Sequence, residues 1–240
     1  FLLIQCPRTP DRFGLPWPRL PVYFQPVTEG DNKGEYRGVA NGMPNPQQDD
    51  YKAMSAPNVQ EKSTDSPLRW MMASEVAFLR AEGAMRGWTA EMGGTAEEFY
   101  NKGIELSFLE NGLSADAAAR YAADETSKPT DFTDVSAANT KYNISALGKI
   151  TIKWNAGASE EEQLERIITQ KWIAMFPNGT EAWSEFRRTG YPLIFPVRSN
   201  YPTSGVDTNK QIRRMVFPQS EYSNNGAAVQ EAVKLLGGPD

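Results

Sequence analysis

The sequence predicts a mainly α-helical protein built from helical hairpins, with long irregular loops and a little β-structure. Three observations support this fold class. Residues 1–66 hold too many prolines and glycines for a long helix, apolar residues recur at helical spacing after Ser66, and capping and stop signals bound the helical segments. We therefore expect a loop region, residues 1–66, packed on a helical region, residues 67–240.

The loop region carries nine prolines and five glycines, which favour ordered loop over helix. Its aromatic residues argue against disorder, and residues 21–26 and 35–39 are expected to be short extended pieces. The chain start, which ends in Cys6, only faintly resembles the end of a lipoprotein signal, because Gln5 replaces the small residue that cleavage prefers. A buried strand or an internal fragment is the preferred interpretation.

The first predicted hairpin covers residues 70–111. Its first helix ends at Gly87 and carries an apolar stripe at helical spacing: Met72, Val76, Leu79 and Gly83. Its second helix opens with Thr95 and Glu98 in the pattern of a capping box and stops at Asn111. The apolar face of this second helix holds Tyr100, Ile104 and Phe108.

The second predicted hairpin covers residues 159–190. A short helix after Ser114 and a long connection, residues 125–157, precede it, and residues 149–154 of the connection are a candidate strand. The first helix begins at Ser159 and carries the stripe Leu164, Ile167, Ile168, Trp172 and Met175. A Pro-Asn-Gly break separates it from the second helix. A final amphipathic helix uses Val229, Ala232, Val233 and Leu236.

Paired helices joined by tight turns are the format of tetratricopeptide-like units, which bury a shared core between stacked pairs. The strict tetratricopeptide consensus is absent, and the two pairs begin about ninety residues apart. The pattern therefore predicts tetratricopeptide-like hairpins rather than a regular repeat array.

Composition excludes several classes of function. The 240 residues contain no histidine and one cysteine, so they can form no Ser-His-Asp triad, no Cys-His pair and no imidazole or Cys-rich metal site. We therefore expect no metal and no cofactor. A net charge of −5 with scattered basic residues argues against a nucleic-acid partner. No apolar run is long enough to span a membrane as a helix.

Two acids of the first helix are the candidate catalytic pair. Glu75 and Glu82 lie seven residues apart on one helix face, which places their Cα atoms about 10.5 Å apart. Their side chains could shorten this separation to the range of an inverting glycosidase. The apolar neighbours favour a structural role, in which both acids bond backbone groups or arginines. The chain is thus predicted not to be an enzyme, and a glycoside hydrolase using Glu75 and Glu82 is the alternative.

A dense set of charges surrounds two tryptophans of the second hairpin. The charged residues are Lys171, Glu181, Glu185, Arg187 and Arg188, and the tryptophans are Trp172 and Trp183. We interpret it as an ion-pair and cation–π network that fixes the hairpin. Binding of an acidic ligand is the alternative role.

Four aromatic residues of the loop region are the candidate ligand contacts: Trp17, Tyr23, Phe24 and Tyr36. An aromatic face stacks on the apolar C–H face of a sugar ring, and neighbouring polar side chains can bond the sugar hydroxyls. Anchoring of the loop to the helices is the alternative role for Tyr23 and Phe24.

Five segments carry a resemblance to a known family. Residues 170–192 read QKWIAMFPNGTEAWSEFRRTGYP, a long tryptophan-rich motif, and residues 212–225 read IRRMVFPQSEYSNN. Residues 75–82 (EVAFLRAE), 100–104 (YNKGI) and 18–24 (PRLPVYF) add to it. Together these segments strongly resemble the SusD/RagB family, in particular its SusD-like lipoprotein branch.

The resemblance implies a tetratricopeptide-like scaffold decorated by loops, on the outer face of a Bacteroidetes-type outer membrane. Attachment would be through a lipid anchor outside this chain. It also implies capture of oligosaccharides, or of peptides in RagB-like members, and their delivery without cleavage to a SusC-like TonB-dependent transporter. Family members are about twice this length, so the N-terminal half of the family fold is expected to be missing. Without the resemblance, a protein–protein adaptor is a third hypothesis.

Overall fold

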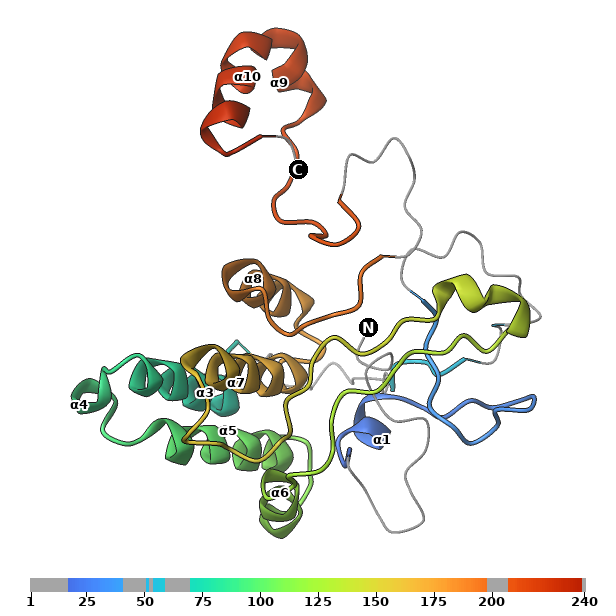
Figure 1. Cartoon of the computed structure of the whole chain (residues 1–240), viewed down its shortest axis with the longest axis vertical. Helices are drawn as coiled ribbons and strands as arrows, with labels where there is room; N and C mark the ends of the chain where they lie inside the picture. Colours follow the sequence, from blue (N-terminus) through green and yellow to red (C-terminus); the bar gives the residue numbers. More distant parts are fainter. Residues whose placement is uncertain (1–16, 41–50, 52–53, 59–69, 198–206, 239–240) are drawn as a thin grey trace. The chain divides into compact units, whose positions relative to one another are not determined.

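A computed structural model describes residues 17–40, 51, 54–58, 70–197 and 207–238 (Figure 1). Spatial clustering divides the chain into two compact units. The first comprises residues 1–39 and 47–195, and the second comprises residues 40–46 and 196–240. The expected boundary at Ser66, like Cys6, lies outside the described residues. The division into a loop region and a helical region therefore stays a prediction.

The first unit contains the predicted first hairpin. It consists of α3 (Ala73–Met85) and α5 (Ala96–Glu110), with the short helix α4 (Thr89–Met92) between them. The Thr95 hydroxyl accepts a hydrogen bond from the Glu98 N–H, while the Glu98 carboxylate accepts one from the Thr95 N–H. The predicted capping box is thus confirmed, and it sets the start of α5.

The second hairpin is formed by α7 (Glu160–Ala174) and α8 (Gly179–Thr189). Ser159 caps α7 by accepting a hydrogen bond from the Glu162 N–H. The three glutamates in the first turn of α7 lie where the helix dipole favours negative charge. Gly190 has a φ of 81° and ends α8 in the left-handed conformation that glycine adopts readily.

The connection between the hairpins contains little regular structure. α6 (Ala115–Ala122) follows the first hairpin, and a 3₁₀ helix, η2, covers Ala137–Tyr142. The predicted strand at residues 149–154 is wrong. Its side chains do alternate, with Ile150, Ile152 and Trp154 buried, but the segment is an extended piece that packs on helices and pairs with no strand. Among the described residues, β-pairing is limited to two isolated bridges.

The loop region departs from expectation at one place. Residues 21–26 were expected to be extended, but Leu20–Tyr23 forms a short helix, α1. Pro21 suits this helix because its fixed φ and missing N–H are tolerated in a first turn. Extended backbone resumes at Phe24, which forms a bridge with Pro57.

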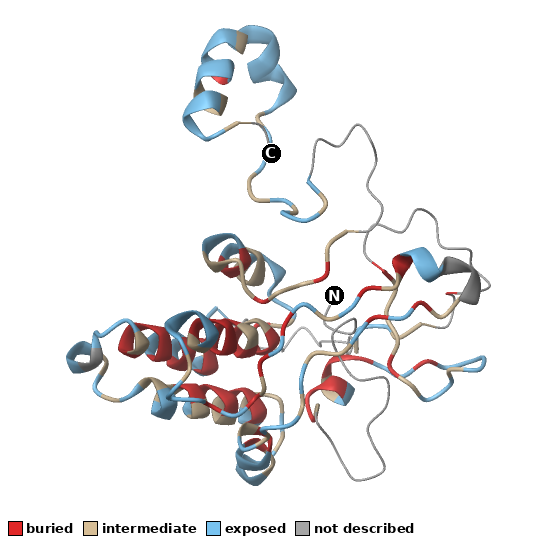
Figure 2. Cartoon of the chain, in the orientation of Figure 1, coloured by how far each residue is buried: buried red, intermediate tan, exposed pale blue. Residues whose placement is uncertain are grey.

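The second unit holds two helices, α9 (Gln219–Asn224) and α10 (Gly226–Leu235). The predicted final amphipathic helix is α10, and it buries Val229. α9 was not predicted, because its six residues carry no apolar stripe. Figure 2 shows that both helices are mostly exposed.

The core of the first unit lies where α3, α5, α6 and α7 face one another, and Figure 2 shows the buried residues on these facing sides. Its largest members are Phe78, Tyr100, Ile104, Phe108, Tyr121, Trp154, Leu164, Ile167 and Ile168. The predicted fold class, a mainly helical protein made of hairpins, is confirmed. Within the described ranges, no helix is both long and apolar enough to cross a membrane.

A glycine allows α3 and α5 to approach closely. Phe78 of α3 is fully buried, and its ring lies directly over Gly103 of α5. A Cβ atom on residue 103 would lie 2.6 Å from the nearest ring carbon of Phe78. Since such a distance is far below van der Waals contact, the pair of helices requires glycine at this position.

Gly103→Ala is expected to lower the free energy of unfolding by about 1–3 kcal/mol, the usual cost of overpacking a core. The loss should occur although alanine is the better helix former by about 1 kcal/mol. Urea titration followed by circular dichroism measures the change. Gly179→Ala is the control, because a Cβ atom there meets nothing within 4 Å. Equal stability of the two variants would contradict the close packing of α3 on α5.

Candidate functional site

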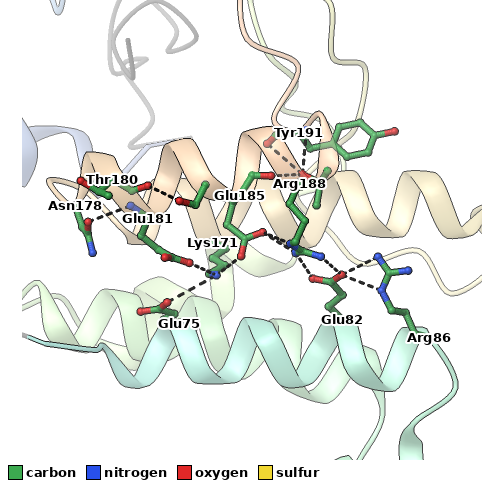
Figure 3. Close-up of polar contacts among 12 residues, drawn as sticks. Glu75, Glu82, Arg86, Lys171, Asn178, Thr180, Glu181, Glu185, Arg188 and Tyr191 are labelled. Carbon is green, nitrogen blue, oxygen red and sulfur yellow. Dashed lines mark hydrogen bonds and ion pairs between the residues drawn. The ribbon is translucent and has the colours of Figure 1, made fainter. Parts of the chain in front are cut away.

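A buried lysine joins the two hairpins. Lys171 of α7 is 1% exposed, and its ammonium lies among three carboxylates (Figure 3). The distances from Nζ are 2.5 Å to Glu185 and 3.0 Å to Glu181, both on α8, and 3.8 Å to Glu75 on α3. A buried ammonium is tolerated only when it is paired and hydrogen-bonded. Here the two acids of α8 lie within hydrogen-bonding distance, and Glu75 of α3 lies farther away.

An arginine fork extends the network to the second acid of α3. Arg188 donates two parallel hydrogen bonds to the carboxylate of Glu82, at 2.7 and 2.6 Å, and also bonds Glu185. Arg86 binds Glu82 from the other side, at 2.9 Å from Nε. Figure 3 shows this chain of charges running along the faces of α3 and α8. We call the set of Glu75, Glu82, Arg86, Lys171, Glu181, Glu185 and Arg188 the charge network.

The pKa values of the two acids of α3 are shifted in opposite directions. Burial raises the pKa of Glu75; Lys171 opposes this shift, while Glu181 and Glu185 add to it. Burial would also raise the pKa of Glu82, but the hydrogen bonds from Arg188 and Arg86 outweigh it and hold that pKa below its ordinary value. Both carboxylates therefore lie beside cations of the second hairpin.

A second buried cation connects the loop region to the helices. Arg19 is 3% exposed and donates hydrogen bonds to Ser107 at 2.8 Å, Gln170 at 2.7 Å and Tyr121 at 3.2 Å. Its guanidinium also lies 5.1 Å from the ring centroids of Phe108 and Tyr121. These partners come from α5, α6 and α7, so one side chain positions the N-terminal loop against three helices.

Three of the four candidate ligand aromatics lie inside this interface. Tyr23, Phe24 and Tyr36 are each less than 10% exposed and belong to one apolar cluster. The rings of Tyr23 and Phe24 pack on Phe176, with centroids 4.9 and 5.0 Å apart. Burial raises the pKa of the Tyr23 hydroxyl. These positions match the anchoring role, because the rings present almost no surface to a ligand.

Trp17 differs from the other three aromatics. Its side chain is half-buried and packs edge-on against Tyr121, with ring centroids 6.3 Å apart. Within the described part of the chain, its Nε1–H is buried and has no hydrogen-bond partner. Trp17 is therefore the one loop aromatic of the four that combines an accessible face with an unsatisfied donor.

The remaining residues of the predicted network lie on α7 and α8. Arg187 stacks on Trp183 at 4.5 Å from the ring centroid. Trp172 is half-buried and packs against the cluster of loop aromatics. The structure thus brings Glu75, Glu82 and Arg188 into one network, while Trp172 packs on the loop aromatics and Trp183 packs on Arg187. Among the described residues, no group of acidic, cysteine or histidine side chains could hold a metal ion.

Two contributors were not singled out by sequence reasoning. Arg86 has an ordinary position at the end of α3, and only its spacing of four residues from Glu82 indicated a pair. Arg19 lies between prolines in an apolar stretch. A charged side chain in such surroundings indicates a buried, multiply bonded cation, which was the available signal.

The paired hairpins and their charge network define a tetratricopeptide-like helical scaffold. A family model described as "SusD-like: Susd and RagB outer membrane lipoprotein" matches residues 13–240. The chain therefore belongs to the SusD-like family of outer-membrane lipoproteins. No curated protein matches it.

Solved structures agree with the family assignment. A chitin-binding SusD homologue from Flavobacterium johnsoniae is 42% identical with a TM-score of 0.78, over 93% of this chain and 44% of its own. A SusD-like protein from Bacteroides thetaiotaomicron is 44% identical with a TM-score of 0.77, over 90% and 44%. A SusD homologue from Bacteroides uniformis is 43% identical with a TM-score of 0.77, over 92% and 44%. The chain thus spans less than half the length of these relatives.

Substitution of the two acids is expected to change stability in opposite directions. The pKa of Glu75 is higher in the folded protein than in the unfolded chain. Ionisation of Glu75 therefore destabilises the fold, and this effect grows as the pH rises above about 4.5. Ionised Glu82 has a lowered pKa, so it stabilises the fold above that pH, and its contribution is lost as pH falls through the folded-state pKa. At pH 7, Glu75→Gln should therefore leave stability unchanged or raised, whereas Glu82→Gln should cost about 1.5–3 kcal/mol.

Urea titrations of both variants between pH 4 and 8 measure these effects. The Glu82→Gln deficit should shrink toward pH 4, because the wild-type carboxylate also becomes neutral as pH falls. Glu105→Gln is the control, since Glu105 forms an exposed pair with Lys102 at the surface of α5. If Glu75→Gln lowered the free energy of unfolding as much as Glu82→Gln, both ionised carboxylates would stabilise the fold equally, and the prediction would be wrong.

Proposed function

We propose that this protein captures an oligomeric nutrient, a glycan in the first instance, at the cell surface and does not cleave it. The observation that carries the proposal is the family match over residues 13–240. The similarity to a chitin-binding homologue, 42% identical over 93% of this chain, supports a glycan as the ligand. The chain spans 44% of that homologue.

The charge network supports a non-catalytic role. Glu82 is held by two arginines, and Glu75 faces the buried ammonium of Lys171. A glycosidase needs one carboxylate free to protonate the leaving group and a second free to attack or to activate water. The alternative of a glycoside hydrolase using this pair would require the network to open, which would expose the Lys171 charge.

Family membership supports a proposal for the partner and the location. We propose a SusC-like TonB-dependent transporter in the outer membrane as the acceptor of the captured ligand. The protein would be held at the cell-surface face by a lipid anchor outside this chain. The family model is named for outer-membrane lipoproteins, which supports this location.

A peptide is the second candidate ligand, because the matching family model includes RagB as well as SusD. Trp17 serves either ligand. Its half-buried ring could stack on a sugar ring or on a peptide side chain.

Calorimetric titration with a panel of chitin oligosaccharides, other glycans and peptides is expected to show binding to at least one oligomer. The affinity should be modest, with Kd roughly between 1 μM and 1 mM, about −8 to −4 kcal/mol. Trp17→Ala should weaken binding. Trp88→Ala, which removes an exposed indole between α3 and α4, should not. Thermal unfolding of both variants checks that the fold is retained.

Two outcomes would count against this function. Failure of every glycan and peptide to bind would leave the protein–protein adaptor as the better hypothesis. Release of reducing ends from a polysaccharide, abolished by Glu82→Gln in a folded variant, would establish the hydrolase instead.

A further inference from the structure

The ring of Trp17, the aromatic that we propose as a ligand contact, lies against Tyr121 of α6. The two ring centroids are 6.3 Å apart and the ring planes meet at 65°, which is an edge-to-face contact. Trp17 is half-buried, whereas Tyr121 is buried. The part of the indole that could meet a ligand is therefore carried on a ring that belongs to the core.

The hydroxyl of Tyr121 is held from two sides. It accepts a hydrogen bond from the guanidinium of Arg19 at 3.2 Å and one from the side-chain amide of Gln170 at 3.1 Å. The amide oxygen of Gln170 accepts a hydrogen bond from the same guanidinium at 2.7 Å. The three side chains form a closed triangle, and all three are buried. A buried polar network whose members bond one another rigidifies the core around it.

The loop contacts Tyr121 at two points. Trp17 and Arg19 are two residues apart, and the N–H of Leu20 donates to the carbonyl of Trp17 at 3.0 Å, which closes the turn that holds them. The guanidinium carbon of Arg19 lies 5.1 Å from the centroid of the Tyr121 ring. The indole and the guanidinium of one turn thus both contact the same tyrosine.

Stacking on a ligand requires a ring in a defined orientation. Apolar contact is non-directional, whereas a hydrogen bond restricts both the distance and the angle between its partners. A residue that binds a ligand must be held within about 0.5 Å of its productive position by packing and by hydrogen bonds of the residues behind it. Behind Trp17, the directional contacts are those of the Tyr121 hydroxyl.

We propose that Tyr121 is a positioning residue for ligand binding. Its hydroxyl, held by Arg19 and Gln170, fixes the ring of Trp17 in the orientation that stacks on the nutrient. Tyr121 is itself buried, so it acts through Trp17 and does not touch the ligand. The inference rests on the proposed function, which gives Trp17 the ligand contact.

A double-mutant cycle between Tyr121→Phe and Trp17→Ala tests the role in the polypeptide expressed from the whole reading frame. The probe is a chitin hexasaccharide, titrated by calorimetry. Tyr121→Phe alone should raise Kd by about three- to tenfold, within the range of coupling between residues in contact. In the Trp17→Ala background, the same change should leave Kd within about twofold. An equal loss of affinity in both backgrounds would overturn the proposal.

Tyr100→Phe is the matched control, because it also removes a buried tyrosine hydroxyl. The hydroxyl of Tyr100 donates to the carbonyl of Ile152, and its ring packs on Trp154 rather than on Trp17. This change should lower the unfolding temperature and leave Kd as it is. A loss of affinity as large as that for Tyr121→Phe would contradict a specific positioning role, since any loosening of the core would then weaken binding.

A measurement without ligand separates this inference from the proposed function. Fluorine NMR of protein labelled with 5-fluorotryptophan reports on each indole, and the resonance lost in Trp17→Ala belongs to Trp17. Tyr121→Phe should shift or broaden this resonance and leave that of Trp183, which stacks on Arg187 of α8, in place.

The two readouts fail independently. If the hexasaccharide did not bind, a glycan of this type would be excluded as the ligand, while a shifted Trp17 resonance in Tyr121→Phe would still support the positioning of the ring. An unchanged Trp17 resonance would overturn the inference, whatever the protein binds.

Discussion

The buried charge of Lys171 is the constraint on which the arrangement of the two hairpins depends. An ammonium that is 1% exposed must be compensated, and its partners come from α3 and α8. The lysine of α7 therefore couples the neighbouring helix α8 to α3, which lies far earlier in the chain. A pair of helices that only buried apolar surface would lack this requirement for a specific relative position.

The same constraint explains why two similar acids of one helix differ. Glu75 shares one ammonium with two other carboxylates, so the negative charge around Lys171 exceeds the positive charge. Glu82 binds the guanidinium groups of Arg86 and Arg188, and of these two only Arg188 also binds a second carboxylate, that of Glu185. Their pKa values move in opposite directions for this reason. A split of this kind between two acids often marks a catalytic pair, but here it arises from unequal sharing of cations within a structural network.

The helices were predictable because local chemistry determines where they begin and end. The capping box at Thr95 and the cap at Ser159 are signals carried by neighbouring residues, and both helices start where those signals lie. The face of α3 was not predictable in this way. Its apolar residues extend around the helix: Val76 and Leu79 of the predicted stripe are exposed, whereas Phe78 lies in the core. Periodicity identifies an interface, and it does not say which neighbour fills it.

The loop aromatics show the same limit for the candidate site. Sequence alone left Tyr23 and Phe24 between ligand contact and anchoring, since an aromatic residue in a loop serves either role. Both rings pack on Phe176, about 150 positions later in the chain, and Arg19 in the same segment bonds residues about 90 to 150 positions later. A contact over such separations leaves no periodic trace.

Once Arg19 has drawn this segment into the core, the aromatics that hold the loop cannot also present a broad stacking surface. Of the four candidates, Trp17 alone keeps a partly open ring, and it lies at the edge of the same cluster. The residues that hold the loop on the helices therefore differ from the one aromatic that keeps an open face. Buried cations and helix packing determine the position of the loop, and among these four aromatics only the ring of Trp17 is left partly open to other contacts.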